Sequence, residues 1–185
     1  MRSLIRLVFL VFIFFGIVLL LYNYVHSYKI INTNDKKVAL YFKNKKEIDK
    51  TSKYDYIGVL EIPKIGLKRG FVNPMSINNN INENITILKP VEMPNEDNSV
   101  FILAAHSGNS NVSFFKNLYK LNYNDDIYVY YNNHKYEYIV VKYYTENKNG
   151  KINIKDNTSI KKLVLTTCSG FNKQIVYIAY FRNCV

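Results

Sequence analysis

The sequence has only two cysteines, Cys168 and Cys184, and no tryptophan among its 185 residues. So few cysteines exclude a disulfide-rich scaffold, and a bridge between these two is the single pairing that the chain allows. Cys184 is the penultimate residue, where chain ends usually fray, so a bridge there would anchor little. We therefore favour two free thiols.

Signatures of nucleic-acid binding are also missing, although the formal net charge is +11. The sequence contains no basic helix, no zinc-ligand spacing and no aromatic RNA-binding motif. Much of the positive charge lies between Lys29 and Lys53, outside the expected folded core. A charge run of this kind is usually a solvated segment, so we expect a basic stalk near an anionic surface and no nucleic-acid partner.

What the chain does have is aromatic and apolar residues, with 17 tyrosines, 11 phenylalanines and 48% hydrophobic residues. This composition suits β-strands better than helices. The length allows one membrane segment and one compact domain of roughly 130 residues. We expect a mainly β protein without internal repeats.

A long apolar run lies near the N-terminus. Residues 7 to 22 carry no charge and no strongly polar group, and the apolar character continues to Val25. This nearly meets the roughly 20 residues that a membrane-spanning helix needs. Arg2 and Arg6 precede the run, which favours a cytoplasmic N-terminus. No small-x-small cleavage pattern follows it, so we expect residues 1–27 to be a single-pass anchor in the cell membrane, with the rest outside.

The remainder divides into a linker and a folded domain. Residues 28–53 are polar and rich in lysine, and we interpret them as a basic linker. The apolar patch 38–42 could form a short packing helix that begins near Asp35. The folded domain is expected to occupy residues 54–185.

Short strands recur throughout this domain. Alternating or continuous apolar runs predict strands at 56–62, 85–88, 100–105, 127–131, 134–143, 160–168 and 174–181. One short helix is expected over residues 114–121, and the paired asparagines Asn132 and Asn133 predict a hairpin turn. We expect an antiparallel β domain with one or two small helices, closed into a barrel.

The strand that ends at Cys168 is the most informative stretch. Alternation places Val164, Thr166 and Cys168 on one face, and Ser169–Gly170 ends the strand. A thiol at a strand end can face a groove. The alternative is a small buried hydrophobe, because free cysteine is among the most buried residue types.

Two further polar residues stand where apolar strands stop, His106 and Arg182. A histidine can transfer protons for a cysteine nucleophile, and an arginine can stabilise a carbonyl oxygen that becomes negative. Taken singly, His106 could be a structural histidine and Arg182 a solvated terminal residue. Together with Cys168 they indicate acyl transfer.

These motifs resemble the sortases, the cysteine transpeptidases of Gram-positive bacterial surfaces. Residues 164–168, Val-Leu-Thr-Thr-Cys, are similar to the family's Thr-Leu-x-Thr-Cys signature. The run 100–108 resembles the strand and loop that carry the family histidine, and 180–182 resembles the last strand with its arginine. Residues 57–67 resemble the opening hairpin.

The resemblance implies an eight-stranded β-barrel after an N-terminal transmembrane helix. It implies that Cys168 attacks a sorting signal similar to Leu-Pro-x-Thr-Gly in a surface protein and forms a thioacyl intermediate. His106 would protonate the leaving amine, Arg182 would stabilise the oxyanion, and Thr167 would help to position the signal. The acyl acceptor would be an amine of a peptidoglycan precursor or of a pilin.

We expect no cofactor and no metal. Glu92, Glu96, Asp97 and Asp156 could form the calcium site that some sortases use, but scattered acidic residues in loops are mostly solvated.

Two other functions fit parts of the pattern. One is another external cysteine acyltransferase, such as an L,D-transpeptidase, although its His-Gly and Ser-x-Gly-Cys motifs are missing from this sequence. The other is a basic, membrane-tethered binding module without catalytic activity.

Overall fold

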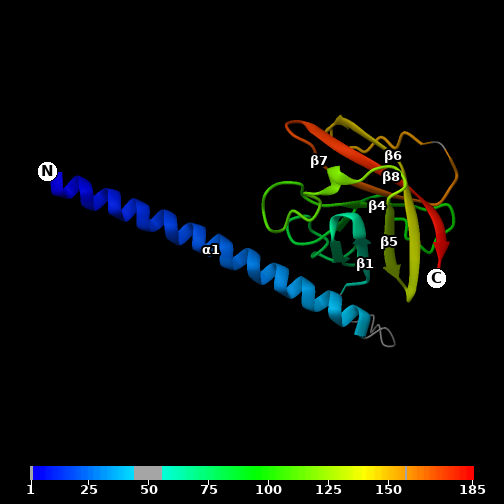
Figure 1. Ribbon diagram of the computed structural model, residues 1–185, viewed down its shortest axis with the longest axis horizontal. Helices are drawn as coiled ribbons and strands as arrows, with labels where there is room; N and C mark the ends of the chain where they lie inside the picture. The colour runs from blue at the N-terminus through cyan, green and yellow to red at the C-terminus, as the bar shows by residue number, and fades with distance from the viewer. Residues whose placement is uncertain (1, 44–55, 157) are drawn as a thin grey trace.

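The computed structural model describes residues 2–43, 56–156 and 158–185 of the chain. In chain order its elements are α1 (Arg2–Lys43), β1 (Gly58–Ile62), the 3-10 helix η1 (Pro63–Ile65), β2 (Leu67–Phe71), β3 (Thr86–Ile87), β4 (Val100–Ala104), the 3-10 helix η2 (Leu118–Lys120), β5 (Asp126–Tyr131), β6 (His134–Asn147), β7 (Lys162–Cys168) and β8 (Lys173–Cys184). Figure 1 shows α1 projecting far beyond one side of a β domain. The prediction of a mainly β, eight-stranded barrel with one or two short helices after an N-terminal apolar helix is confirmed.

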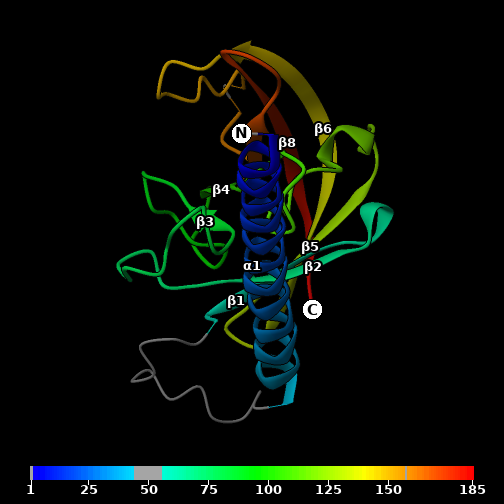
Figure 2. The same ribbon diagram turned by 90° about the vertical axis from the view of Figure 1, so that its left-hand side faces the viewer.

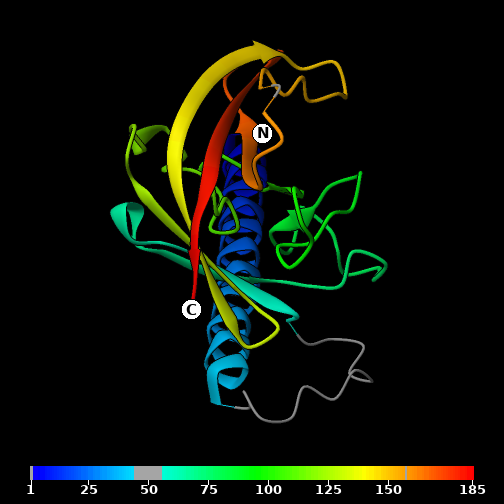
Figure 3. The ribbon, with the colours of Figure 1, turned by 90° about the vertical axis from the view of Figure 1, so that its right-hand side faces the viewer.

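All eight strands form one sheet in the order β2-β1-β5-β6-β8-β7-β4-β3. A single bridge between Phe71 and Ile85 brings the two edges of the sheet together, so the barrel is nearly closed. The long strands β6 and β8 curve over one side of the domain (Figure 3). The expected antiparallel arrangement is wrong for β4 and β7, which pair in parallel, and the bridge between Phe71 and Ile85 is parallel as well. Parallel neighbours need a crossover connection, and here β5 and β6 lie between them in the sequence.

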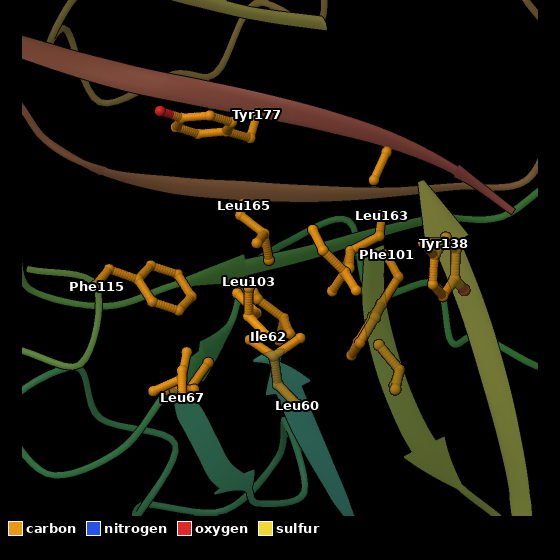
Figure 4. Close-up of a cluster of buried hydrophobic side chains, with 14 of the residues drawn as sticks. Leu60, Ile62, Leu67, Phe101, Leu103, Phe115, Tyr138, Leu163, Leu165 and Tyr177 are labelled. Carbon is orange, nitrogen blue, oxygen red and sulfur yellow. The ribbon is translucent and has the colours of Figure 1, made fainter. Parts of the chain in front are cut away.

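The barrel interior is filled by the alternate side chains of the strands. Leu60 and Ile62 of β1 meet Phe101 and Leu103 of β4 inside the barrel, with Leu163 of β7 beside them (Figure 4). All five side chains are fully buried. These residues stand at every second position of their strands, as expected for side chains that share the core-facing side.

A second apolar cluster lies on the outer face of β4, β7 and β8. Its buried members are Ile102, Val164, Val176 and Ile178. Two isoleucines of the connection between β6 and β7, Ile152 and Ile154, pack against it. The outer face of these strands is therefore covered by a loop, which explains the near-continuous apolar runs in β4 and β7.

Helix α1 differs from the predicted linker. It continues without a break to Lys43, so the short packing helix expected near Asp35 is the last part of one 42-residue helix. The residues that are at least partly buried in this part of the helix follow a helical repeat, at positions 27, 30, 31, 34, 37, 38, 41 and 42. No glycine or proline between Asn23 and Lys43 interrupts it. The predicted boundary at residue 53 lies outside the described residues and stays a prediction.

The C-terminal part of α1 packs against the barrel. Val38 is buried in a cluster with Val59 and Val72, and Phe42 contacts the Tyr130 ring edge-to-face at a centroid distance of 4.9 Å. Figure 2 shows α1 running across the front of the β domain. Amphipathic packing, more than intrinsic propensity, stabilises this part of the helix.

The N-terminal half of α1 has no contact with the barrel, and the apolar side chains from Ile5 to Val25 are almost all exposed. The helix is long and apolar enough to cross a membrane. In a bilayer its exposed apolar surface would lie in lipid.

The hairpin between β5 and β6 confirms a local prediction. Asn132 and Asn133 have φ angles of 49° and 65°, the left-handed conformation that a tight hairpin turn requires. His134, at the start of β6, is exposed. Over residues 114–121 the regular part is the short 3-10 helix η2, and Leu118 and Leu121 fill the core from it.

Candidate active site

The parallel pairing of β4 with β7 places the two predicted reactive residues at the same end of the barrel. Ala104 pairs with Thr166, and both strands end within two residues of that pair. The carboxyl ends of parallel neighbours lie at the same edge of a sheet, so His106 follows β4 beside the end of β7, where Cys168 stands.

Two side-chain hydrogen bonds tie these strand ends together. The Thr167 hydroxyl donates to the Ala105 carbonyl at 2.6 Å, and the Ser107 hydroxyl donates to the Cys168 carbonyl at 2.5 Å. They flank His106 on both sides. The backbone that carries the histidine is therefore fixed against the backbone that carries the cysteine.

Thr167 itself is buried and faces away from the outer surface. The expectation that its side chain positions a substrate therefore needs correction, because its hydroxyl is bonded to the Ala105 carbonyl. Successive side chains of a strand point to opposite faces, and Thr167 takes the inner one. Its contribution is to hold the two strand ends together.

Cys168 lies on the outer face and is half-buried, with a free thiol. The alternative of a fully buried small hydrophobe does not describe it. The Lys148 ammonium, directly after β6, donates to Cys168 Sγ at 3.4 Å. Cys184 is also free and is exposed at the other end of β8.

His106 is half-buried and has a polar partner. Its Nε2 lies 3.0 Å from Asn82 Oδ1, and an amide oxygen at this distance accepts a hydrogen bond from a protonated Nε2. The His106 carbonyl accepts a hydrogen bond from the Phe115 amide at 2.9 Å. These contacts fix both the ring and the backbone of the histidine.

Arg182 is not brought to this site, which corrects the prediction. Cys168 pairs with Gln174 on β8, and Arg182 is eight residues further along that strand, roughly 26 Å at 3.3 Å per residue. Its guanidinium lies 3.0 Å from Asp126 and 3.7 Å from Glu137. In Figure 1 the turn from β7 to β8 and the C-terminus lie at opposite ends of β8. The order of the motifs correctly predicted that Arg182 lies on the last strand, but the residue stands at the end of β8 that is far from Cys168.

Two of the four acidic residues considered for calcium have other partners. Glu92 accepts a hydrogen bond from the Val100 amide, and Asp156 forms a buried ion pair with Lys162 at 2.8 Å. In the described part of the chain no group of three or more His, Cys, Asp or Glu side chains could hold a metal ion.

The sortase domain family profile matches residues 60–181 of the chain. The chain belongs to the sortase family. A search of curated protein sequences finds no match. Among solved structures, the sortase D5 transpeptidase of Clostridium perfringens matches with a TM-score of 0.67 and 19% identity, over 82% of this chain and 99% of that one.

Two other sortases show the same fold. Sortase C1 of Streptococcus agalactiae has a TM-score of 0.62 and 25% identity, over 74% of this chain and 71% of its own. Sortase A of Listeria monocytogenes has a TM-score of 0.59 and 19% identity, over 70% of this chain and 88% of its own. The likeness extends to sortases of classes A, C and D, and it establishes the eight-stranded fold.

Three residues of this sortase's site were not singled out from the sequence: Asn82, Lys148 and Gln174. Asn82 belongs to an asparagine-rich stretch and Lys148 to a loop rich in lysine and asparagine, so neither stands out by type. Gln174 could have been found, because a four-residue connection between β7 and β8, residues 169–172, places residues 168 and 174 opposite each other in a tight antiparallel pair.

Proposed function

We propose that this sortase is a membrane-anchored cysteine transpeptidase whose nucleophile is Cys168 and whose proton-transfer group is His106. The observation that carries the proposal is the pair of hydrogen bonds joining residues 105 and 107 to the strand end at Cys168. In a member of this family, a cysteine and a histidine on strand ends that are hydrogen-bonded to each other support acyl transfer.

In the proposed reaction the Cys168 thiolate attacks the carbonyl carbon of a peptide bond in a Leu-Pro-x-Thr-Gly-like signal. The C–N bond breaks, the acyl group stays on sulfur as a thioester, and His106 gives a proton to the leaving amine. An incoming amine then attacks the thioester and passes a proton to His106. The new amide leaves, and the thiolate is regenerated.

The partners follow from the family. A sortase C of Streptococcus pneumoniae is described with pilin substrate specificity, and a group B Streptococcus sortase C as pilus-related. For the present chain we propose a surface protein with a C-terminal sorting signal as acyl donor. A peptidoglycan-precursor or pilin amine would be the acceptor. The apolar half of α1 would span the cell membrane, with the N-terminus in the cytoplasm and the barrel outside.

The deciding experiment uses the full chain in detergent micelles with a panel of Leu-Pro-x-Thr-Gly variants. We expect mass spectrometry to find an acyl adduct on Cys168 that an added amine releases. Cys168→Ala should form none, and Cys184→Ala, the matched removal of the other thiol, should form it normally. A folded protein that alkylates at Cys168 yet accepts no peptide would point to a different acyl donor. An unreactive Cys168 would favour a binding module.

A further inference from the structure

The outward-facing side chains of strand β8 beside the reactive thiol carry no charge. Three cross-strand pairs place Gln174, Val176 and Ile178 opposite the outward residues of β7. Opposed residues of an antiparallel pair share a face of the sheet, so these are the β8 side chains beside Cys168. None of the three carries a charge, and Arg182 lies at the far end of the strand.

Lys148 is the cation in contact with the sulfur. Its Nζ lies 3.4 Å from Cys168 Sγ, a distance at which an ammonium group donates a hydrogen bond to sulfur. Its backbone amide donates to the Asn172 carbonyl at 2.9 Å. This bond extends the pairing of β6 with β8 one residue beyond the Asn147–Lys173 pair. The base of the lysine side chain is therefore fixed to the sheet.

The Gln174 side chain hydrogen-bonds to residues before and after Lys148 in the sequence. Its amide donates to Glu146 at 2.8 Å and to the Lys151 carbonyl at 2.7 Å. Glu146 also accepts a hydrogen bond from the Asn153 amide at 3.2 Å. The first turn of the connection between β6 and β7 is thereby folded back on the strand end, which keeps Lys148 over the thiol.

We propose that Lys148 is a catalytic residue of this site and stabilises the thiolate form of Cys168. The thiolate is the nucleophilic form of cysteine, and an adjacent ammonium favours it over the thiol. A lysine supplies a compact charge with three rotatable donors, without the rigid fork of an arginine. The neutral Gln174 occupies the cross-strand position and acts through Lys148 as a positioning residue. The inference rests on the proposed nucleophile, Cys168.

The test measures how fast iodoacetamide alkylates Cys168 in the full chain in micelles at pH 7, in a Cys184→Ala background. We expect Lys148→Met to lower the second-order rate constant about fivefold, since the ammonium group that contacts the attacking sulfur is lost. Lys148→Arg should restore the rate to within about twofold, because it keeps a cation at the same position. Lys151→Met, which removes a lysine from the same loop, should leave the rate unchanged. Gln174→Ala should lower the rate constant to a value between those of the natural chain and Lys148→Met.

An unchanged rate in Lys148→Met would overturn the proposal. An equal loss in Lys151→Met would also overturn it, because the effect would then be the general charge of the loop. Alkylation needs no peptide, so its result is separate from that of the proposed transfer reaction. A Lys148-dependent rate in a protein that accepts no sorting signal would support the present inference and reject the proposed acyl donor.

Discussion

Strand β7 has a lysine contact at each end, and the two contacts lie in different environments. At its start, the Lys162 ammonium pairs with Asp156 at 2.8 Å, with side chains 3% and 7% exposed. At its end, the Lys148 ammonium reaches the Cys168 sulfur at 3.4 Å from an exposed position. The buried pair has its charges satisfied by protein groups, while the exposed lysine can approach a substrate.

The difference separates a structural use of charge from a chemical one. Lys162 also donates to the Thr158 carbonyl at 2.8 Å, so the strand start and the loop before it are joined. A buried charge is held by full hydrogen bonding and cannot move without cost. The four predictions below test this contrast between the two ends of β7.

The largest effect is expected at the buried end. Lys162→Met leaves Asp156 buried without its partner, and we expect a loss of about 3–5 kcal/mol in unfolding free energy. Urea unfolding of the full chain in micelles, followed by near-ultraviolet circular dichroism, measures it.

Lys161→Met is the matched control, because the Lys161 ammonium lies 5.0 Å from the Phe181 ring centre and forms no ion pair with a carboxylate among the described residues. Its cost should stay below about 1 kcal/mol. Equal losses in the two variants would contradict a special role for the buried pair.

The second prediction concerns the stability of the protein at acidic pH. Burial opposes ionisation of Asp156, but hydrogen bonds from Lys162 and Thr158 outweigh it and lower the pKa of Asp156 to about 2. Because the folded value lies below the ordinary one of 3.8, the stabilisation is complete above about pH 4 and is lost as the pH falls toward 2. We expect protonation of Asp156 to lower the unfolding free energy by about 2 kcal/mol over this pH range.

Unfolding free energies at pH 7, 4 and 2.5, compared between the natural chain and Asp156→Asn, check the pH dependence. The variant should be less stable at pH 7 and should lose about 2 kcal/mol less on acidification. Parallel curves for the two proteins would assign the acid sensitivity to other carboxylates.

Much of this fold was predictable from local pattern. The strand ending at Cys168 and the Asn132–Asn133 turn are dictated by alternation and by the backbone freedom of asparagine. The parallel pairing of β4 with β7 was missed, because strand periodicity does not encode which strands become neighbours. The length of α1 was missed because its inward face holds polar residues such as Asn34, which is 4% exposed.

The site was predictable only where motif and strand end coincide. Cys168 and His106 each follow an apolar run, and the parallel pairing brings those ends together. The prediction for Arg182 was wrong because it rested on motif order alone, whereas the short turn after Cys168 sets the register of β8 and places Gln174 opposite the cysteine. The contact of Lys148 with Cys168 could not be predicted from the sequence, since nothing distinguishes this lysine from the others in the loop until the loop is folded.

The third prediction addresses the reactive end. Thr167→Val removes the hydroxyl that binds the Ala105 carbonyl, and we expect a cost of about 1 kcal/mol in stability. Because this bond aligns His106 with Cys168, the rate of acyl transfer should fall by about tenfold.

Thr166→Val gives the matched comparison. Its hydroxyl donates to the Ile175 carbonyl at 3.2 Å, away from the strand end of β4. We expect a similar change in unfolding free energy and an unchanged transfer rate. A loss of transfer in both variants would mean that general loosening of β7, and not the link to Ala105, slows the reaction.

The smallest effect is expected for Arg182→Gln. Arg182 pairs with Asp126 and Glu137 at a position where the guanidinium is 46% exposed, and exposed pairs contribute less than about 1 kcal/mol. Since the residue lies far from Cys168 along β8, both the alkylation rate of Cys168 and the transfer rate should stay within about twofold of the natural chain. The rates of Arg182→Gln and Lys148→Met, measured side by side, compare the loss of a distant arginine with the loss of the lysine that contacts the sulfur. A transfer rate abolished by Arg182→Gln with normal stability would return the oxyanion role to Arg182, and would require β8 to shift its register by several residues during the reaction.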